Sequence, residues 1–414
     1  MIAAVWTASL LLFIAAGLSV WKFADIAALD LPARISIAFT CGLTIVATLM
    51  YLESALGIRW SALTLGIPFL VIVALSAWRL PIGSRTGWPR GYSIAFAAVA
   101  LISLYAAASA RMTIADLMYF WGPKAVHFFH ERAIDVEFLR FPHYYLMHPD
   151  YPPLVPLTWA ASSMIAGKFS YWGAVLTAPL LLIAAALTFR GFASPVLGPR
   201  KSAAFATLLL AVTTVAAIAG SAAGGGDPYL LAFEATALSA LTFSRARGAT
   251  VIAAIALAGA AFAKVEGAAF AASVGIALLL VGRFRSAIAV VSPAVLLVAS
   301  WIAFSRHHGL LDAYGRADRQ LHLSNLGAVL RWSGQQLSYR SLYLPWIAAL
   351  GPFVVARSFR PAILPLLVAL ASLAYSLYFY LHEPNPLWWI QSSAERVMTT
   401  TLLCFVVATA AASE

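Results

Sequence analysis

The sequence is poor in charge: only 10% of its 414 residues are Asp, Glu, Lys or Arg, whereas 62% are hydrophobic. Soluble domains carry roughly 25% charged residues, so this chain lacks the polar surface that a water-soluble protein needs. In a bilayer the shortage is expected, because each charge at the centre costs at least ~2.5–3.5 kcal/mol. The mean hydropathy of +0.87 therefore predicts an integral membrane protein.

Cysteine and the common catalytic signatures are scarce as well. Cys41 and Cys404 both fall in apolar segments and give neither a disulfide framework nor a metal site. The sequence has no Gly-rich phosphate loop ending in Lys-Ser/Thr, no His-Glu-x-x-His and no Gly-x-Ser-x-Gly. His307 and His308 are adjacent but lack a partner at a metal-ligand spacing, so no zinc site is expected.

Apolar segments of about 17–23 residues, by contrast, recur along almost the whole chain, and each can cross a ~30 Å hydrocarbon core as a helix. They are rich in Ala and Leu and do not alternate strictly, which argues against an outer-membrane barrel. The first segment lacks a basic n-region and a convincing cleavage site, so we expect a retained helix rather than a signal peptide. About thirteen spans are predicted, near 2–21, 35–52, 60–78, 93–110, 171–189, 203–220, 228–243, 249–263, 267–282, 287–304, 341–356, 361–381 and 397–412.

The expected fold class is thus an all-α, polytopic integral membrane bundle. It forms a single transmembrane domain over 1–414, with external interfacial helices and no soluble C-terminal domain. Two long polar loops, 111–170 and 305–340, are expected on one side of it.

The charged loops predict the orientation, because Lys and Arg are in excess in cytoplasmic loops. One set of alternate loops is short, basic and nearly free of acids, and we place it in the cytoplasm. Its residues are Lys22, Arg34, Arg79, Arg85, Arg90, Arg190, Arg200, Lys201, Arg245, Arg247, Arg283, Arg285, Arg357 and Arg360, with Asp25, Asp30 and Glu414 as the acids. Since the basic residues lie mostly in such loops, the net charge of +11 does not indicate a nucleic-acid partner.

The opposite side carries both long loops and most of the acids and histidines. Polar residues can simply collect wherever loops are long. Asp227, Lys264 and Glu266, however, lie in very short turns that need no ionisable residue. A charge kept at membrane depth indicates a functional site, so we expect the external face to be the working face.

The first long loop begins with Asp116, followed by Leu117, Phe120, Val126 and Phe129 at about helical spacing. This pattern predicts an amphipathic helix in the membrane interface. At its start, Asp116 can either cap the helix or face a cavity as a general base.

Further along the same loop, Asp150 and Tyr151 precede Pro152 and Pro153. Two prolines force an extended chain, which fits either a re-entrant loop or the start of a helix. In the Gly226-Asp227-Pro228 turn, glycine allows a close backbone approach and Asp227 is expected to N-cap the next helix.

Lys264 and Glu266 are two residues apart and so do not share a helix face, which predicts that one points into a cavity and the other to its rim. Arg396, at the external end of the last helix, can bind a phosphate bidentately or extend to lipid head groups. The 305–340 loop is basic on the outer face and is expected to attract an anionic lipid phosphate. Its charged and histidine residues are Arg306, His307, His308, Arg316, Arg319, His322, Arg331 and Arg340, against Asp312 and Asp318.

Taken in order, several elements resemble the GT-C superfamily of membrane glycosyltransferases, which includes the protein mannosyltransferases and the aminoarabinose transferases. They are Asp116, Trp-x-x-Lys-Ala at 121–125, Tyr-Pro-Pro-Leu at 151–154, Gly-Asp-Pro at 226–228, Lys-x-Glu-Gly at 264–267 and Ser-x-x-Arg at 393–396. The resemblance covers about 110–400. Unlike many members, this chain is expected to have three extra helices before the Asp loop and no external C-terminal domain.

The resemblance implies transfer of a sugar from a polyprenyl-phosphate-linked donor on the periplasmic face of a bacterial inner membrane, to a glycan, lipid or protein acceptor. It assigns the reaction centre to Asp116. Such a transfer needs a base, cations for the departing phosphate and a water-free cavity. We expect Asp150, Tyr151, Asp227 and Glu266 to orient the acceptor, and Lys124, Lys264 and Arg396 to bind the phosphate.

No metal ligand set is predicted, although acids on this face can hold Mg²⁺ or Mn²⁺. Two alternatives stay open: a lipid or solute transporter or flippase, and a surface-polysaccharide ligase or polymerase. A transporter is expected to place charges near the midplane and on both sides of it.

Overall fold

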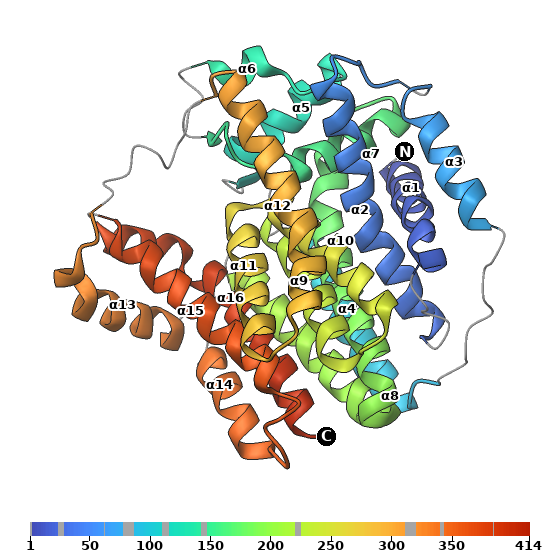
Figure 1. Cartoon of the computed structure of the whole chain (residues 1–414). Helices are drawn as coiled ribbons and strands as arrows, with labels where there is room; N and C mark the ends of the chain where they lie inside the picture. Colours follow the sequence, from blue (N-terminus) through green and yellow to red (C-terminus); the bar gives the residue numbers. More distant parts are fainter. Residues whose placement is uncertain are drawn as a thin grey trace.

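The apolar segments fold into helices in the computed structural model (Figure 1). The structure describes residues 2–23, 29–61, 63–77, 87–109, 116–141, 147–219, 225–310, 320–339, 343–383 and 385–414, and these ranges contain no β-strand. The α-helices are α1 (Ile2–Phe23), α2 (Leu31–Ala55), α3 (Gly66–Ala77), α4 (Arg90–Ser109), α5 (Gly122–Glu131), α6 (Val136–Arg140), α7 (Leu154–Ala166), α8 (Tyr171–Ala219), α9 (Asp227–Phe243), α10 (Arg247–Ala263), α11 (Val265–Leu280), α12 (Phe284–His307), α13 (Leu326–Tyr339), α14 (Leu344–Val355), α15 (Ile363–Leu381) and α16 (Pro386–Ala412). A π-helix, η1 (Asp116–Trp121), precedes α5, and a 3₁₀ turn, η3 (Leu323–Asn325), precedes α13.

By length and composition, five helices in the described ranges can cross a membrane: α2, α4, the Tyr171–Ala216 part of α8, α12 and α15. A sixth is α16 if its two parts, Pro386–Ala394 and Arg396–Ala412, which meet at 53°, form one span. The chain is therefore a multi-pass membrane protein of the helical type, as its composition predicts. Helices α3, α9, α10, α11 and α14 have only 12 to 17 residues, so the number of about thirteen spans stays a prediction.

The predicted break between 189 and 203 is present, but as a sharp kink at Gly198, where two helices of α8 meet, rather than as a long loop. The φ of 78° at Gly198 is accessible to glycine but costly for other residues. Arg190 consequently lies inside a helix, with 1% of its surface exposed, and pairs with Asp30 at the start of α2.

Helix α7 lies where the sequence predicts an external loop, and most of its residues are buried. It begins at Leu154, directly after Pro153, so the two prolines mark the start of a helix rather than a re-entrant loop. Before it, the segment predicted to form an interfacial helix is helical, as η1 followed by α5.

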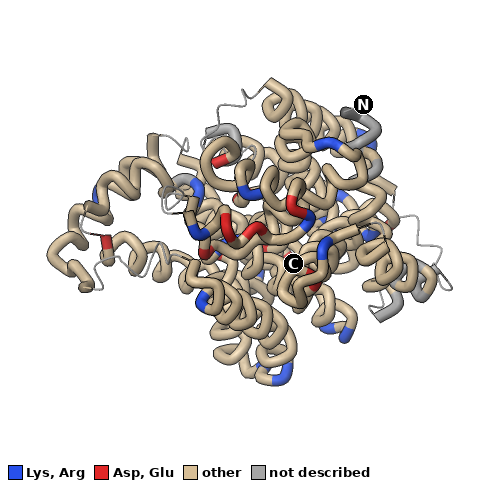
Figure 2. Tube along the Cα trace, turned by 90° about the horizontal axis from the view of Figure 1, so that it is seen from above, with Lys and Arg blue, Asp and Glu red and all other residues tan. Residues whose placement is uncertain are grey.

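Two of the residues assigned to the cytoplasmic loops, Lys201 and Arg357, both lie at the C-terminal end of α16. The Lys201 ammonium donates to the Ser413 carbonyl at 2.8 Å, and the Arg357 backbone N–H donates to the Ala412 carbonyl at 3.0 Å. Asp25, Arg79 and Arg85 of this set lie outside the described residues, as do Asp312, Arg316, Asp318, Arg319 and Arg340 of the 305–340 loop. Seen from above, several acidic positions gather near the centre of the bundle, with basic positions beside them (Figure 2).

Candidate functional site

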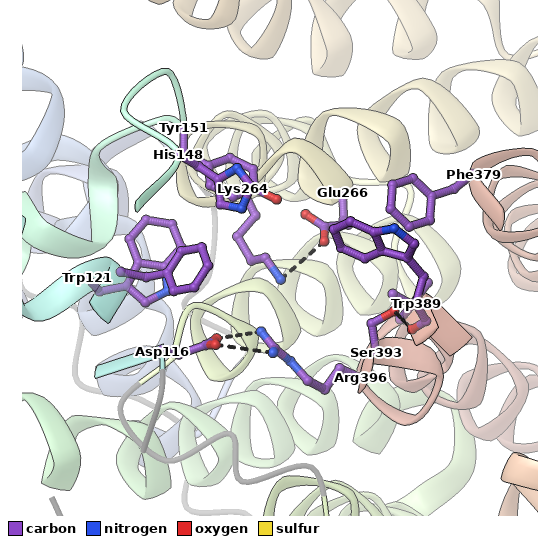
Figure 3. Close-up of a pocket in the computed structure, with 12 residues that line it drawn as sticks. Asp116, Trp121, His148, Tyr151, Lys264, Glu266, Phe379, Trp389, Ser393 and Arg396 are labelled. Carbon is purple, nitrogen blue, oxygen red and sulfur yellow. Dashed lines mark hydrogen bonds and ion pairs between the residues drawn. The ribbon is translucent and has the colours of Figure 1, made fainter. Parts of the chain in front are cut away.

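Five of the eight predicted site residues line one cavity of about 110 Å³: Asp116, Tyr151, Lys264, Glu266 and Arg396 (Figure 3). They come from η1, the segment before α7, the junction of α10 with α11, and α16. The other lining residues are Phe120, Trp121, His148, Phe379, Trp389, Ser393 and Val397. Residues up to 280 positions apart in the sequence thus meet at one place.

Arg396 binds two carboxylates at once. Its two terminal nitrogens contact the two carboxylate oxygens of Asp116, at 2.5 and 3.3 Å, in the fork geometry that suits an oxyanion. Its Nε donates to the second carboxylate, that of Asp227, at 2.6 Å. Arg396 therefore joins η1 to the start of α9.

Lys264 extends the same network. Its ammonium donates to Asp227 at 2.7 Å and lies 3.2 Å from a Glu266 oxygen. Asp227 thus holds both cations, one on each carboxylate oxygen. Carboxylates and cations alternate along this network, which contains three carboxylates and two cations. One negative charge is therefore in excess.

The expected N-cap role of Asp227 is wrong. Asp227 is the first residue of α9, the cap position is Gly226, and no side chain there caps the helix. The two cations hold the Asp227 carboxylate instead. The preceding glycine provides the close approach that the sequence predicts, because a Cβ on Gly226 would lie 2.9 Å from Cδ of Lys264.

The prediction that Lys264 and Glu266 point apart is wrong too. Lys264 is not helical: with φ of −155° and ψ of 159°, it is an extended residue between α10 and α11. The helix-face rule therefore does not apply, and the two side chains form an ion pair. Gly267 allows this tight corner, because a Cβ there would lie 1.9 Å from the Ala260 carbonyl oxygen of α10.

Aromatic side chains form the walls of the cavity. Trp121 stacks on Tyr151 with ring centroids 5.8 Å apart, and Phe120 stacks on His148 at 5.0 Å. Across the cavity, Trp389 of α16 packs edge-on against Phe379 (Figure 3). The site therefore combines a charged floor with apolar, flat walls, the usual composition of a small-molecule pocket.

Lys124 and Asp150, two of the predicted site residues, do not line the cavity. The Lys124 ammonium is buried and donates to the His148 carbonyl at 2.6 Å, and Trp301 donates to the Asp150 carbonyl at 2.7 Å. Burial lowers the pKa of Lys124 to about 7, although Asp150 opposes the shift. These two residues lie behind the wall that His148 and Tyr151 present.

His148 has no predicted role, yet it lines the cavity. Burial lowers its pKa to about 4; Lys124 and Lys264 act in the same direction and Glu266 opposes them. Its backbone has a φ of 46°, a left-handed conformation that is uncommon outside glycine. Only the unusual His-Pro-Asp sequence at 148–150 gives a local signal for it.

Glu234 is the other ionisable residue that the sequence interpretation missed. It lies fully buried within α9 and both of its carboxylate oxygens contact the Thr400 hydroxyl of α16, at 2.8 and 3.0 Å. A lone acid in the middle of an apolar segment is the signal that identifies it. It adds a second contact between α9 and α16, next to that of Asp227 with Arg396.

Within the described ranges, no group of three or more His, Cys, Asp or Glu side chains is arranged to hold a metal ion. No protein family model, curated protein or solved structure matches the chain. The geometry of the cavity is consequently the basis for a functional proposal.

Proposed function

We propose that the protein is a membrane glycosyltransferase that moves a sugar from a polyprenyl-phosphate-linked donor to an acceptor hydroxyl. The observation that carries this proposal is the cavity in which the Asp116 carboxylate and the Arg396 guanidinium meet between aromatic walls. The C–H faces of a sugar ring pack on aromatic rings, because positive C–H groups are attracted to the negative ring face.

Each requirement of the transfer has a residue at this cavity. Asp116 is the proposed base for the acceptor proton, with Tyr151 and Glu266 orienting the acceptor. Arg396 and Lys264 are the cations proposed for the departing phosphate, and Asp227 holds both in place. Lys124 and Asp150 would act only through the His148–Tyr151 wall, not on the substrate.

The finer parts of the fold belong to the same proposal. We place about thirteen spans in a GT-C-like bundle in the bacterial inner membrane, with the cavity open to the periplasm. The clustering of Lys201 and Arg357 near the C-terminal end of α16 supports this orientation through the excess of basic residues in cytoplasmic loops.

Cysteine labelling tests the orientation. The native Cys41 and Cys404 are buried, so new cysteines report cleanly. Glu137, on α6, and Arg200, on α8, are both exposed. In intact spheroplasts, a membrane-impermeant maleimide is expected to label Glu137→Cys but not Arg200→Cys, and the opposite pattern refutes the orientation.

Mass spectrometry of envelope glycolipids and glycans, with and without the protein, identifies the product. The purified protein is then tested with undecaprenyl-phosphate-linked hexoses and pentoses, with release of undecaprenyl phosphate as the readout. Absence of any protein-dependent change in glycans, together with no turnover of these donors, refutes the proposal.

Asp116→Asn is expected to lower turnover by about 10²–10⁴-fold, the contribution of one positioned acid–base group, and to leave the protein folded. Glu131→Gln is the matched control, since it removes a carboxylate from the surface near Arg59, away from the cavity. Normal transfer by a folded Asp116→Asn protein removes Asp116 from the reaction centre.

A transporter is the second candidate, and Glu234 is the observation that favours it. A buried acid at membrane depth is common in proton-coupled transport, and Glu234 contacts a second helix through Thr400. Transport into proteoliposomes that is lost in Glu234→Gln, with no sugar transfer, would establish this alternative.

A further inference from the structure

We propose that the donor phosphate and Asp116 compete for the same atoms of Arg396, so that Arg396 changes partner when the donor binds. This inference rests on the proposed function and specifies how the site admits its substrate.

The geometry identifies the exchangeable contact. Arg396 directs its two terminal nitrogens at the two oxygens of Asp116, which is also the arrangement that a guanidinium adopts with a phosphate. Its third nitrogen, Nε, donates to Asp227, so three of the five guanidinium N–H groups are engaged. A phosphate that takes the end of the fork displaces Asp116, while Asp227 keeps the guanidinium in place.

Exposure separates the fixed contacts from the exchangeable one. The side chains of Arg396 and Asp116 are 23% and 17% exposed, whereas those of Lys264 and Asp227 are 7% and 9% exposed. Ion pairs that face water are weak, and breaking a buried pair is costly. Glu266 is 24% exposed as well, but its partner Lys264 is not. The pair of Arg396 with Asp116, in which both partners are partly exposed, is thus one that a ligand in the cavity can open at low cost.

The size of the cavity favours such an opening. Its space of about 110 Å³ is small beside the pockets of about 300–1,000 Å³ that hold small molecules. Asp116 and Arg396 lie on opposite sides of it and are joined across it (Figure 3). Parting them enlarges the cavity and frees the Asp116 carboxylate for an acceptor hydroxyl.

Charge is conserved around Arg396 during the proposed reaction. The acceptor oxygen forms a bond to the sugar C1, and its proton moves to Asp116, which becomes neutral. The bond from C1 to the phosphate oxygen breaks, and its electron pair stays on the phosphate, which gains one negative charge. Arg396, which already binds the phosphate at this stage, therefore contacts the partner whose negative charge grows.

This exchange predicts an unusual phenotype: Asp116→Asn, although inactive in transfer, binds the phosphate more tightly. The probe is undecaprenyl phosphate titrated into the protein in lipid nanodiscs. We expect about a tenfold lower Kd for Asp116→Asn than for the wild type, because the competing carboxylate is gone. Undecaprenol, which lacks phosphate, is expected to show no gain, and inorganic phosphate tests whether the lipid is needed.

Two controls isolate Arg396. Glu131→Gln removes the same charge away from the cavity and is expected to leave the Kd unchanged, whereas Asp116→Asn with Arg396→Gln loses the gain. Asp116→Ser is a second variant should Asp116→Asn not fold. An unchanged or higher Kd in a folded Asp116 variant overturns the exchange.

The outcome is independent of the transfer assay. Suppose that Asp116→Asn binds undecaprenyl phosphate more tightly but the wild type has no transferase activity. That result refutes the proposed function and leaves the exchange standing. Transferase activity with unchanged phosphate affinity refutes only the exchange.

Discussion

Two charged clusters inside this protein differ in whether a ligand can reach them. In the first, Asp30 pairs with Arg190 and accepts the Ala33 backbone N–H at 3.1 Å, while the guanidinium of Arg190 lies 4.3 Å from the ring centre of Trp88. In the second, three carboxylates surround two cations at the edge of a cavity. The first joins α2 to α8. The second carries excess charge and faces the cavity.

The comparison teaches that burial of charge does not by itself indicate a functional site. Arg190 is more deeply buried than Arg396, yet its known contacts all fix the fold. The cavity cluster differs in having an excess carboxylate, aromatic walls and a partly exposed ion pair.

The largest stability effect is expected for Arg190→Met. Removal of one partner from a buried ion pair costs about 3–5 kcal/mol, because the buried Asp30 carboxylate loses the Arg190 guanidinium. Arg396→Met should cost clearly less, since Lys264 still pairs with Asp227. Thermal unfolding in detergent measures the stability of both variants. Equal losses of stability would show that the two clusters contribute to the fold in the same way.

A smaller effect, on activity, is expected for Gly226→Ala. The φ of −77° at Gly226 accommodates alanine, but the new Cβ would press on the aliphatic part of the Lys264 side chain. The Lys264 ammonium is held by two carboxylates, so the side chain cannot move away freely. We expect transfer to fall about tenfold through this misplacement, with little change in stability. Gly173→Ala, where a Cβ meets nothing within 4 Å, is the control. Equal activities of the two variants would contradict the argument.

The smallest effect concerns pH. Because the pKa of His148 falls from 6.5 to about 4 on folding, the unfolded chain binds the proton first as the pH drops between these values. Stability is therefore complete above pH 6.5 and decreases towards pH 4, by about 1–2 kcal/mol after discounting the part of the ring that faces water. Asparagine tolerates the left-handed backbone, so His148→Asn should flatten this dependence in thermal unfolding. A profile identical to that of the wild type would exclude His148 as its origin.

The sequence predicts the helices well because long apolar runs have no other stable form in a membrane. Prediction from sequence fails where tertiary packing determines the extent of a helix. At 13 residues, α7 is too short to be recognised as a span, and the first part of α8 continues past Arg190, whose guanidinium pairs with Asp30 and lies against Trp88.

The residue types of the site are also predictable, since Asp227, Lys264 and Glu266 occupy turns that need no charge. Their partners are not, because local spacing says nothing about an extended residue such as Lys264 or about contacts across 280 positions. Lys124 shows the same limit: its motif resembles a site element, but its side chain points to the His148 carbonyl behind the wall.

The corner at Gly267 limits how this site can diversify. Since the backbones of α10 and α11 meet there without an intervening side chain, the corner that carries Lys264 and Glu266 has no room for a larger residue at position 267. Altered selectivity for a ligand must then arise on the facing side, where Phe379 and Trp389 can be exchanged for other shapes. Libraries that vary this aromatic pair while leaving the corner intact are the rational starting point for changing what the cavity accepts.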